Sequence, residues 1–237
     1  SEYGKDLLKY KWFANDDNKN FERFLVRGPG HRPDCAPRDD LADLLVQNLN
    51  MDVQHVRHVI VFINGEYWGI HTVKERFDQK YLANKYGRDD DDYVILRTGG
   101  VLDSGTEGDD QHYADLLSYV SSSDMSLDVN YDYVKEIIDM DNYLTYFTSE
   151  VFVGNVDWVD TNIKFWRYKG KSTKSGNING IDGKYRWFLY DFDLTFGGSC
   201  ADVNPRVNVL HKAFDPDYGR STTLATGLRQ NQQFVND

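Results

Sequence analysis

One segment of the chain carries two side chains whose spacing suits work on a hydroxyl group and a phosphate. In Asn155–Asn162, Asp157 is followed five positions later by Asn162. A carboxylate can orient or deprotonate a hydroxyl group, and an amide oxygen can bind a hard metal cation. A loop of this length can turn both side chains toward one phosphate. The same pair is common by chance, so it is a weak signal by itself.

A second segment, Tyr190–Gly197, places two carboxylates between a predicted strand and a glycine turn. Side chains two positions apart share a face of a pleated strand, so we expect Asp191 and Asp193 to reach one cation. Two carboxylates, with phosphate oxygens and water, form a reasonable shell for Mg²⁺. Such a pair also occurs in solvated turns. The two segments together are stronger evidence than either alone, because they follow each other as two loops separated by predicted strands.

The elements that must position these loops are predicted from periodicity and turn residues. Strands are predicted at residues 24–27, 56–63, 67–73, 93–97, 163–168 and 185–190. Asn64-Gly65, between two of these strands, predicts a hairpin. Helices are predicted at residues 39–49, 78–86, 109–121, 131–140 and 141–153, with a weaker helical pattern at 222–234.

The order of these elements indicates the fold class. Strands come first, helices follow, and a two-stranded piece precedes the end, which is typical of an α+β fold with two lobes around a cleft. The first long helix has an apolar stripe, and Asp39 or Asp40 is placed to cap its start. The stripe consists of Leu41, Leu44, Leu45 and Leu49.

Composition excludes some classes of function. The 237 residues carry a formal net charge of -11, which disfavours binding to nucleic acid or to anionic lipid through charge. No run approaches the ~20 apolar residues of a membrane helix. Because the chain begins at Ser1 and not at Met, it is expected to be a trimmed or mature product. Cys35 and Cys200 are compatible with one disulfide or with two unrelated thiols.

Several longer blocks resemble one known family. They are Leu25–Gly28, Arg38-Asp39, Phe62–Ile70, Lys74–Asp78, Gly154–Trp158 and Trp187–Gly197. Over roughly residues 20–235 the chain is similar to the spore coat protein H (CotH) kinase family, and the blocks that begin at Phe62 and Gly154 are long and specific.

The resemblance implies a single, diverged, two-lobed kinase-like domain over residues 1–237. Residues 1–100 would form part of the N-terminal lobe, and residues 101–237 a C-terminal lobe with the catalytic and metal loops. Such a protein would transfer phosphate from ATP, with Mg²⁺ or Mn²⁺, to Ser or Thr of a surface or coat protein. It implies a secreted or cell-surface location.

Motif matching implies roles for individual residues. Asp157 matches the catalytic-loop aspartate, Asn162 a metal ligand and Asp191 the principal metal-binding aspartate, with Asp193 as a second candidate. Phosphoryl transfer would then depend on positioning and on neutralising charge.

The chain also departs from the family pattern. The family's earlier segment, an Arg-Gly-Asn/Ser-rich strand followed by a Lys-rich strand, lies before the start of this chain, so we expect a fragment with an incomplete nucleotide lobe. Lys74 and Arg97 are the internal candidates to hold phosphate. Without a GxGxxG motif, either residues 28–30 or residues 98–100 would have to cover the phosphates.

Two other functions stay open at this point. One is a non-catalytic surface or adhesion module that keeps the fold, which the absent glycine-rich loop favours. The other is a metal- or phosphate-binding carrier that would bind nucleotide without transferring phosphate to a protein.

Overall fold

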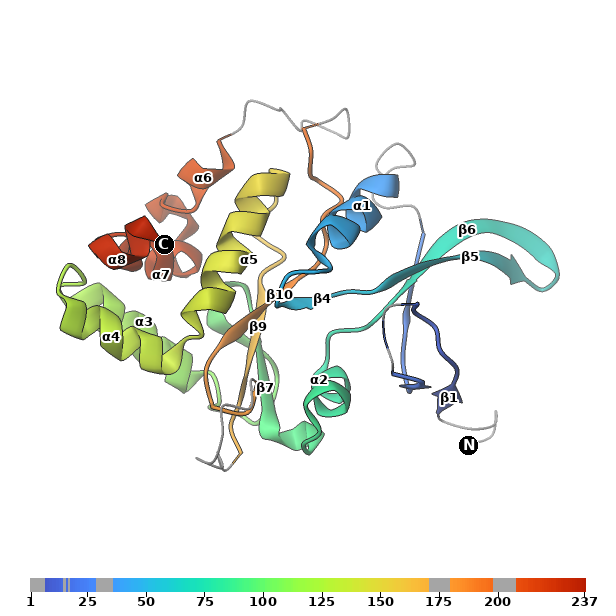
Figure 1. Ribbon diagram of the computed structural model, residues 1–237, viewed down its shortest axis with the longest axis horizontal. Helices are drawn as coiled ribbons and strands as arrows, with labels where there is room; N and C mark the ends of the chain where they lie inside the picture. Colours follow the sequence, from blue (N-terminus) through green and yellow to red (C-terminus); the bar gives the residue numbers. More distant parts are fainter. Residues whose placement is uncertain (1–6, 15, 17, 29–35, 171–179, 198–207) are drawn as a thin grey trace.

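The computed structural model describes residues 7–14, 16, 18–28, 36–170, 180–197 and 208–237 (Figure 1). Cys35 and Cys200 lie outside the described residues, and so do Pro29 and Gly30 of the first glycine turn.

A five-stranded mixed sheet forms the centre of the chain, in the order β4-β10-β9-β7-β8. The strands are β4 (Asp52–Val53), β7 (Tyr93–Arg97), β8 (Val101–Ser104), β9 (Lys164–Tyr168) and β10 (Arg186–Leu189). β4 runs parallel to β10, whereas the other neighbours are antiparallel. The predicted strands 93–97, 163–168 and 185–190 are therefore confirmed within one or two residues.

Both faces of this sheet are buried. Neighbouring residues along a strand point to opposite faces, so a single strand contributes to two separate clusters. Along β7, Val94 and Leu96 join the main core, whereas Tyr93 and Ile95 join a second cluster with Leu82 of α2 (Gln79–Tyr86). A strand buried on both faces shows a continuous apolar run without alternation, and the sequence of β7 has that form.

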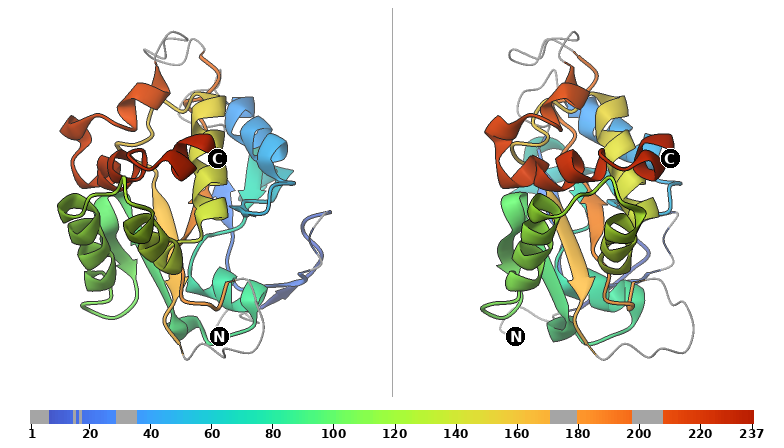
Figure 2. Two further views of the ribbon diagram at one scale, coloured as in Figure 1. Left: turned by 60° about the vertical axis from the view of Figure 1, so that its left-hand side comes forward. Right: turned by 90° about the vertical axis from the view of Figure 1, so that its left-hand side faces the viewer.

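Helices supply the main core on one face of the sheet. They are α3 (Gln111–Ser122), α4 (Asp128–Ile137), α5 (Met140–Val153) and α7 (Arg220–Leu228), with the short α6 (Val209–Lys212) and α8 (Gln232–Asn236) near the C-terminus. The views in Figures 1 and 2 show α3, α4, α7 and α8 gathered on one side of β7, β9 and β10, away from α2. Gly154, at φ 65°, ends α5 in the left-handed conformation that glycine adopts without strain.

A three-stranded sheet, in the order β3-β6-β5, stands apart from this body. It contains β3 (Leu25–Arg27), β5 (Val56–Ile63) and β6 (Glu66–Lys74). Asn64 and Gly65 have φ of 52° and 86°, as expected for the predicted hairpin turn. β5 and β6 project outward (Figure 1), and a small pair, β1 (Leu8–Lys9) and β2 (Asn20–Phe21), lies near their base.

Helix α1 (Ala36–Val46) forms where the sequence predicts a helix, but its orientation differs from the apolar pattern. The predicted capping role of Asp39 or Asp40 is wrong, since both lie inside the helix and are buried with Asp43. The leucine stripe faces solvent instead. The physical reason is that two cations from other elements bind the acidic face of α1.

The α+β fold class is confirmed. Among the described helices, none combines the length and the apolar character needed to cross a membrane.

Candidate functional site

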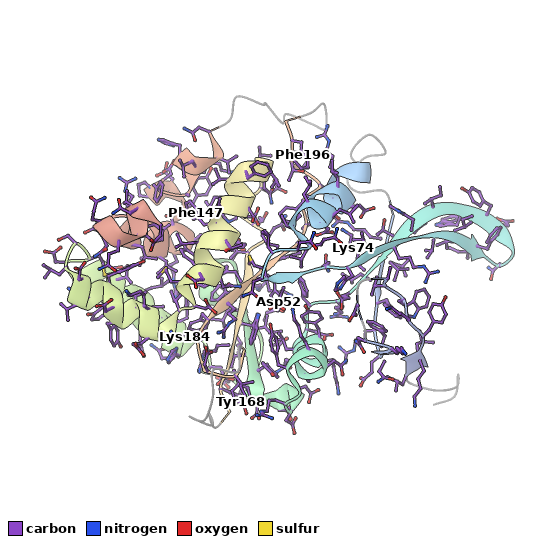
Figure 3. The ribbon with its side chains drawn as sticks, in the orientation of Figure 1. Asp52, Lys74, Phe147, Tyr168, Lys184 and Phe196 are labelled. Carbon is purple, nitrogen blue, oxygen red and sulfur yellow. The ribbon has the colours of Figure 1, made fainter. Side chains whose placement is uncertain are left out.

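Lys74, the last residue of β6, is buried against the acidic face of α1 at the base of the hairpin (Figure 3). Its Nζ lies 2.6 Å from Asp39 Oδ2, 2.6 Å from Asp43 Oδ2 and 3.3 Å from Asp40 Oδ1. A lysine ammonium has three N–H donors, so three carboxylates saturate it. Burial lowers the pKa of Lys74, but Asp43 and Asp39 outweigh burial and the net shift is upward.

Asp40 also binds partners on the hairpin. Its Oδ2 accepts a hydrogen bond of 2.8 Å from Thr72 Oγ1 and lies 2.7 Å from Nε2 of His58. These contacts fix α1 against both long strands.

The same helix holds the segment with the paired carboxylates. Asp39 Oδ1 accepts a 2.8 Å hydrogen bond from the backbone N–H of Phe192, and Arg38 donates a 3.1 Å hydrogen bond to the carbonyl of Thr195. The adjacent residues Arg38 and Asp39 thus connect α1 to the 191–195 segment, which is more than 150 positions away in the chain.

Arg27, the last residue of β3, brings the two carboxylates together. Its Nη1 lies 2.5 Å from Asp191 Oδ1 and 3.1 Å from Asp39 Oδ2, and its Nη2 lies 3.1 Å from Asp193 Oδ2. Burial lowers the pKa of Arg27, but the carboxylates of Asp39, Asp191 and Asp193 raise it above its ordinary value.

Asp191 and Asp193 face one cation, but not for the reason that the sequence suggested. The prediction that both lie on a pleated strand is wrong, because β10 ends at Leu189 and Asp191 has a φ of 61°. A turn therefore brings the two side chains to Arg27. The positive φ is uncommon for an aspartate, and such strain is often found at functional sites.

Backbone hydrogen bonds place the segment Asn155–Asn162 beside this turn. The N–H of Val156 donates to the carbonyl of Leu194 at 3.1 Å, and that of Phe196 donates to the carbonyl of Val153 at 2.8 Å. The structure thus brings together the two segments that the sequence singled out.

Asp157 lies near a cation on α6. The ammonium of Lys212 donates a hydrogen bond to the carbonyl of Val156. Burial lowers the pKa of Lys212, while Asp160 and Asp157 oppose that shift. Lys212 is a neighbour of Asp157 that the sequence did not indicate, because the two are far apart in the chain.

Asn162 and Arg97 lie at the adjoining ends of β9 and β7. Asn162 has a φ of 58° just before β9, and its neighbour Ile163 donates a 3.4 Å hydrogen bond to Thr98 Oγ1. Arg97 is exposed, pairs with Lys164 across the sheet, and forms no ion pair within the part of the chain that the structure describes. Among the described residues, no ion pair joins Arg97 to the carboxylates around Arg27.

The glycine turn at residues 98–100 is partly built into the fold. A Cβ on Gly100 would lie 2.6 Å from the ring of Tyr113 on α3, so this glycine allows close packing. Gly99, at φ 72°, has open space around it. Only the first part of this turn is therefore free to approach a ligand.

Charge within the cluster is unbalanced. Five carboxylates surround the two cations Lys74 and Arg27, and Oδ1 of Asp43 accepts no hydrogen bond among the described residues. Burial raises the pKa of Asp43 to about 8, with Asp39 and Asp40 adding to the rise and Lys74 opposing it. The five carboxylates are Asp39, Asp40, Asp43, Asp191 and Asp193.

Such a set of oxygen ligands fits a hard divalent cation such as Mg²⁺ or Mn²⁺. Asp39, Asp40 and Asp43 also form a group whose ligand atoms lie within 4.8 Å of one another. Sequence reasoning missed Arg27 and the acidic face of α1. The only signal for them was the Arg38-Asp39 pair and the strand before it, which carried family resemblance without a role.

A family, and no individual curated protein, matches this chain. The search of curated proteins found no match. The family model described as "CotH kinase protein" matches residues 14–236, which is nearly the whole chain. The chain belongs to the CotH kinase family.

Proposed function

We propose that this kinase-like protein transfers the γ-phosphate of ATP to Ser or Thr of a protein substrate, with Mg²⁺ or Mn²⁺. The observation that carries the proposal is the meeting of Asp191 and Asp193 at one cation, beside the loop that contains Asp157. Protein kinases need this pairing of a metal loop with a catalytic loop.

Asp191, Asp193 and Asn162 would hold the metal ion, which supplies charge neutralisation at the phosphates when it is bound. Asp157 would orient the acceptor hydroxyl and accept its proton. Its position is fixed from both sides: α5 ends immediately before the loop, and the carbonyl of Leu194 accepts the N–H of Val156. Lys212 adds positive charge next to this aspartate.

A phosphotransfer assay with γ-labelled ATP, Mn²⁺ and a mixture of surface proteins tests the proposal. We expect Asp157→Asn to lower transfer by at least 100-fold while ATP binding, followed by thermal shift, is kept. Asp191→Ala should abolish the metal-dependent thermal shift itself. Asp217→Asn, on an exposed turn, is the control and should match the parent protein. Full activity of Asp157→Asn would exclude this mechanism.

A second candidate function is supported by the projecting hairpin. Six large apolar side chains are exposed there, and exposed apolar groups of this kind often mark protein interaction sites. They are Ile60, Phe62, Ile63, Tyr67, Trp68 and Ile70. A protein that binds no ATP with either metal, yet binds surface proteins through this hairpin, would be the non-catalytic module.

A location at the cell surface or outside the cell belongs to the same proposal. Its support is the family resemblance alone, and fractionation of the native host, with an antibody to the chain, would test it.

A further inference from the structure

The two cations of the acidic cluster differ in how far a ligand can reach them. The side chain of Lys74 is 2% exposed and its three donors face three carboxylates. The side chain of Arg27 is 34% exposed. A group that contacts a nucleotide phosphate must be accessible from solvent before the ligand arrives, so Arg27 meets this condition and Lys74 does not.

The chemistry of Arg27 also suits a phosphate. Its guanidinium has five N–H donors in a planar fork, which matches the oxygens of carboxylates and phosphates. At present the fork binds Asp191 and Asp193, which are the carboxylates proposed above as metal ligands. A cation that bound these carboxylates would neutralise them and repel the guanidinium. Of its three carboxylates, Arg27 would then keep Asp39, which it shares with Lys74, and the phosphates of a metal-bound nucleotide would replace the two anions that it loses.

The position of Arg27 in the fold supports the same role. It ends β3, the strand that precedes α1, and it pairs with Asp39 on that helix at 3.1 Å. In protein kinases the phosphate-binding lysine lies on a strand and pairs with a glutamate of helix αC. Arg27 and Asp39 form a strand-to-helix pair of this kind, and β3 is the strand that comes before the helix in the chain. Lys74 also pairs with Asp39, at 2.6 Å, but it does so from the later strand β6.

We propose that Arg27 is the phosphate-binding residue of this site, and that it holds Asp191 and Asp193 until metal and nucleotide replace it. Lys74 then has a different role: it fixes α1 to β6 and never reaches the ligand. This inference rests on the proposed function, because it assigns a residue to the same nucleotide site.

The test measures binding of Mn²⁺ alone, of adenosine and of MnATP to the whole chain, with Arg27→Met beside the parent protein. We expect Arg27→Met to weaken MnATP binding at least tenfold and to change adenosine binding less than twofold. It should also tighten binding of Mn²⁺ alone at least threefold, because two carboxylates lose their competing cation. Arg23→Met, an exposed arginine four positions earlier that pairs with Asp78, should change none of the three affinities.

The outcomes separate this inference from the proposed function. If the parent protein binds neither Mn²⁺ nor MnATP, both are rejected. If the parent binds MnATP and Arg27→Met binds it equally well, or binds Mn²⁺ less tightly, the role of Arg27 alone is rejected. If Arg27→Met does not fold, Arg27→Lys replaces it, since lysine keeps the charge but loses the fork. We expect that variant to lose at least threefold in MnATP affinity, and an unchanged affinity would overturn the assignment.

Discussion

Asp52 and Asp43 are two aspartates with equally buried side chains, each 1% exposed, but their surroundings are opposite. Figure 3 labels Asp52 and also Lys74, the residue that pairs with Asp43. Asp52 accepts hydrogen bonds from Lys85 Nζ at 2.6 Å, Trp166 Nε1 at 2.9 Å and two tyrosine hydroxyls. Among the described residues, Asp43 has one cationic partner, carboxylate neighbours and one oxygen without a donor.

The difference separates a carboxylate whose charge is balanced by several donors from one whose charge is poorly balanced. A buried carboxylate is stable where enough hydrogen-bond donors surround it. Where such donors are missing, the carboxylate needs a proton or a cation. Asp52 satisfies the first condition and joins β4, α2 and β9. Asp43 meets the second, and burial, which raises its pKa to about 8, lets a proton supply what the missing donors do not.

The largest effect is expected for Asp52→Ala. This change leaves the indole N–H of Trp166 and the hydroxyls of Tyr81 and Tyr86 without their acceptor in a buried region. We expect a loss of about 3–5 kcal/mol in the free energy of unfolding, measured by urea denaturation. Asp132→Ala, at an exposed pair with Lys135, should stay within about 0.5 kcal/mol. A loss below about 1 kcal/mol for Asp52→Ala would show that its donors find other partners.

A smaller loss is expected for Lys74→Met. Removing the ammonium leaves Asp39 and Asp43 buried without their main counter-charge, which should cost about 2–4 kcal/mol at pH 8. At pH 6 the loss should be smaller, because Asp43, with its pKa raised to about 8, is then protonated. The measurement is urea denaturation at both pH values.

A double variant provides the control for the lysine. In Lys74→Met with Asp43→Asn, the buried carboxylate is removed together with its cationic partner. We therefore expect the double variant to regain at least about 1 kcal/mol of the free energy of unfolding that Lys74→Met loses. If the loss of the double variant equals the sum of the losses of Lys74→Met and Asp43→Asn measured separately, the Lys74–Asp43 contact contributes nothing specific.

Glu150 on α5 lies between these two cases. It is fully buried, and among the described residues its carboxylate has one donor, Asn155 Nδ2, at 2.9 Å. Burial raises its pKa from 4.5 to about 8, while the bond from Asn155 opposes the rise. Between pH 4.5 and 8 the folded protein keeps a proton that the unfolded chain has released. The free energy of unfolding must therefore fall as the pH rises through this window, and the contribution levels off above pH 8.

Glu150→Gln cannot ionise and should remove this part of the pH dependence. We expect the variant to be more stable than the parent at pH 8 by about 1–3 kcal/mol, and nearly equal at pH 4.5. Urea denaturation across pH 4.5–8.5 checks it, with the exposed Glu136→Gln as the control. Parallel curves for the parent and Glu150→Gln would mean that Glu150 is ionised in the folded protein.

Local features of the fold could be predicted from the sequence because their causes are local. Asn64-Gly65 specifies its hairpin turn through positive φ angles, and Gly87, at φ 71°, ends α2 as predicted. The Asp157 and Asp191 segments were singled out by the spacing of their side chains; the structure places them side by side, and their roles stay predictions.

The rest of the site depends on contacts between distant parts of the chain. Arg27 and Asp193 are separated by 166 positions, and no pattern within either segment predicts their contact. For α1, apolar spacing predicted the helix but not its orientation. Lys74 and Arg27 attract its acidic face, and ion pairing with these tertiary partners decides which side is buried.

The orientation of α1 leads to the smallest expected effect. Leu45 is 54% exposed, whereas its neighbour Val46 is buried in the main core. Leu45→Gln should therefore change the free energy of unfolding by no more than about 0.5 kcal/mol, while Val46→Gln should cost about 2 kcal/mol or more. Glutamine is about as good a helix former as leucine and a better one than valine, so helix propensity cannot be the cause of a larger loss at Val46. Equal losses in urea denaturation would mean that the leucine stripe is buried, and the contacts of Asp39 and Asp43 with Lys74 could not then form as described.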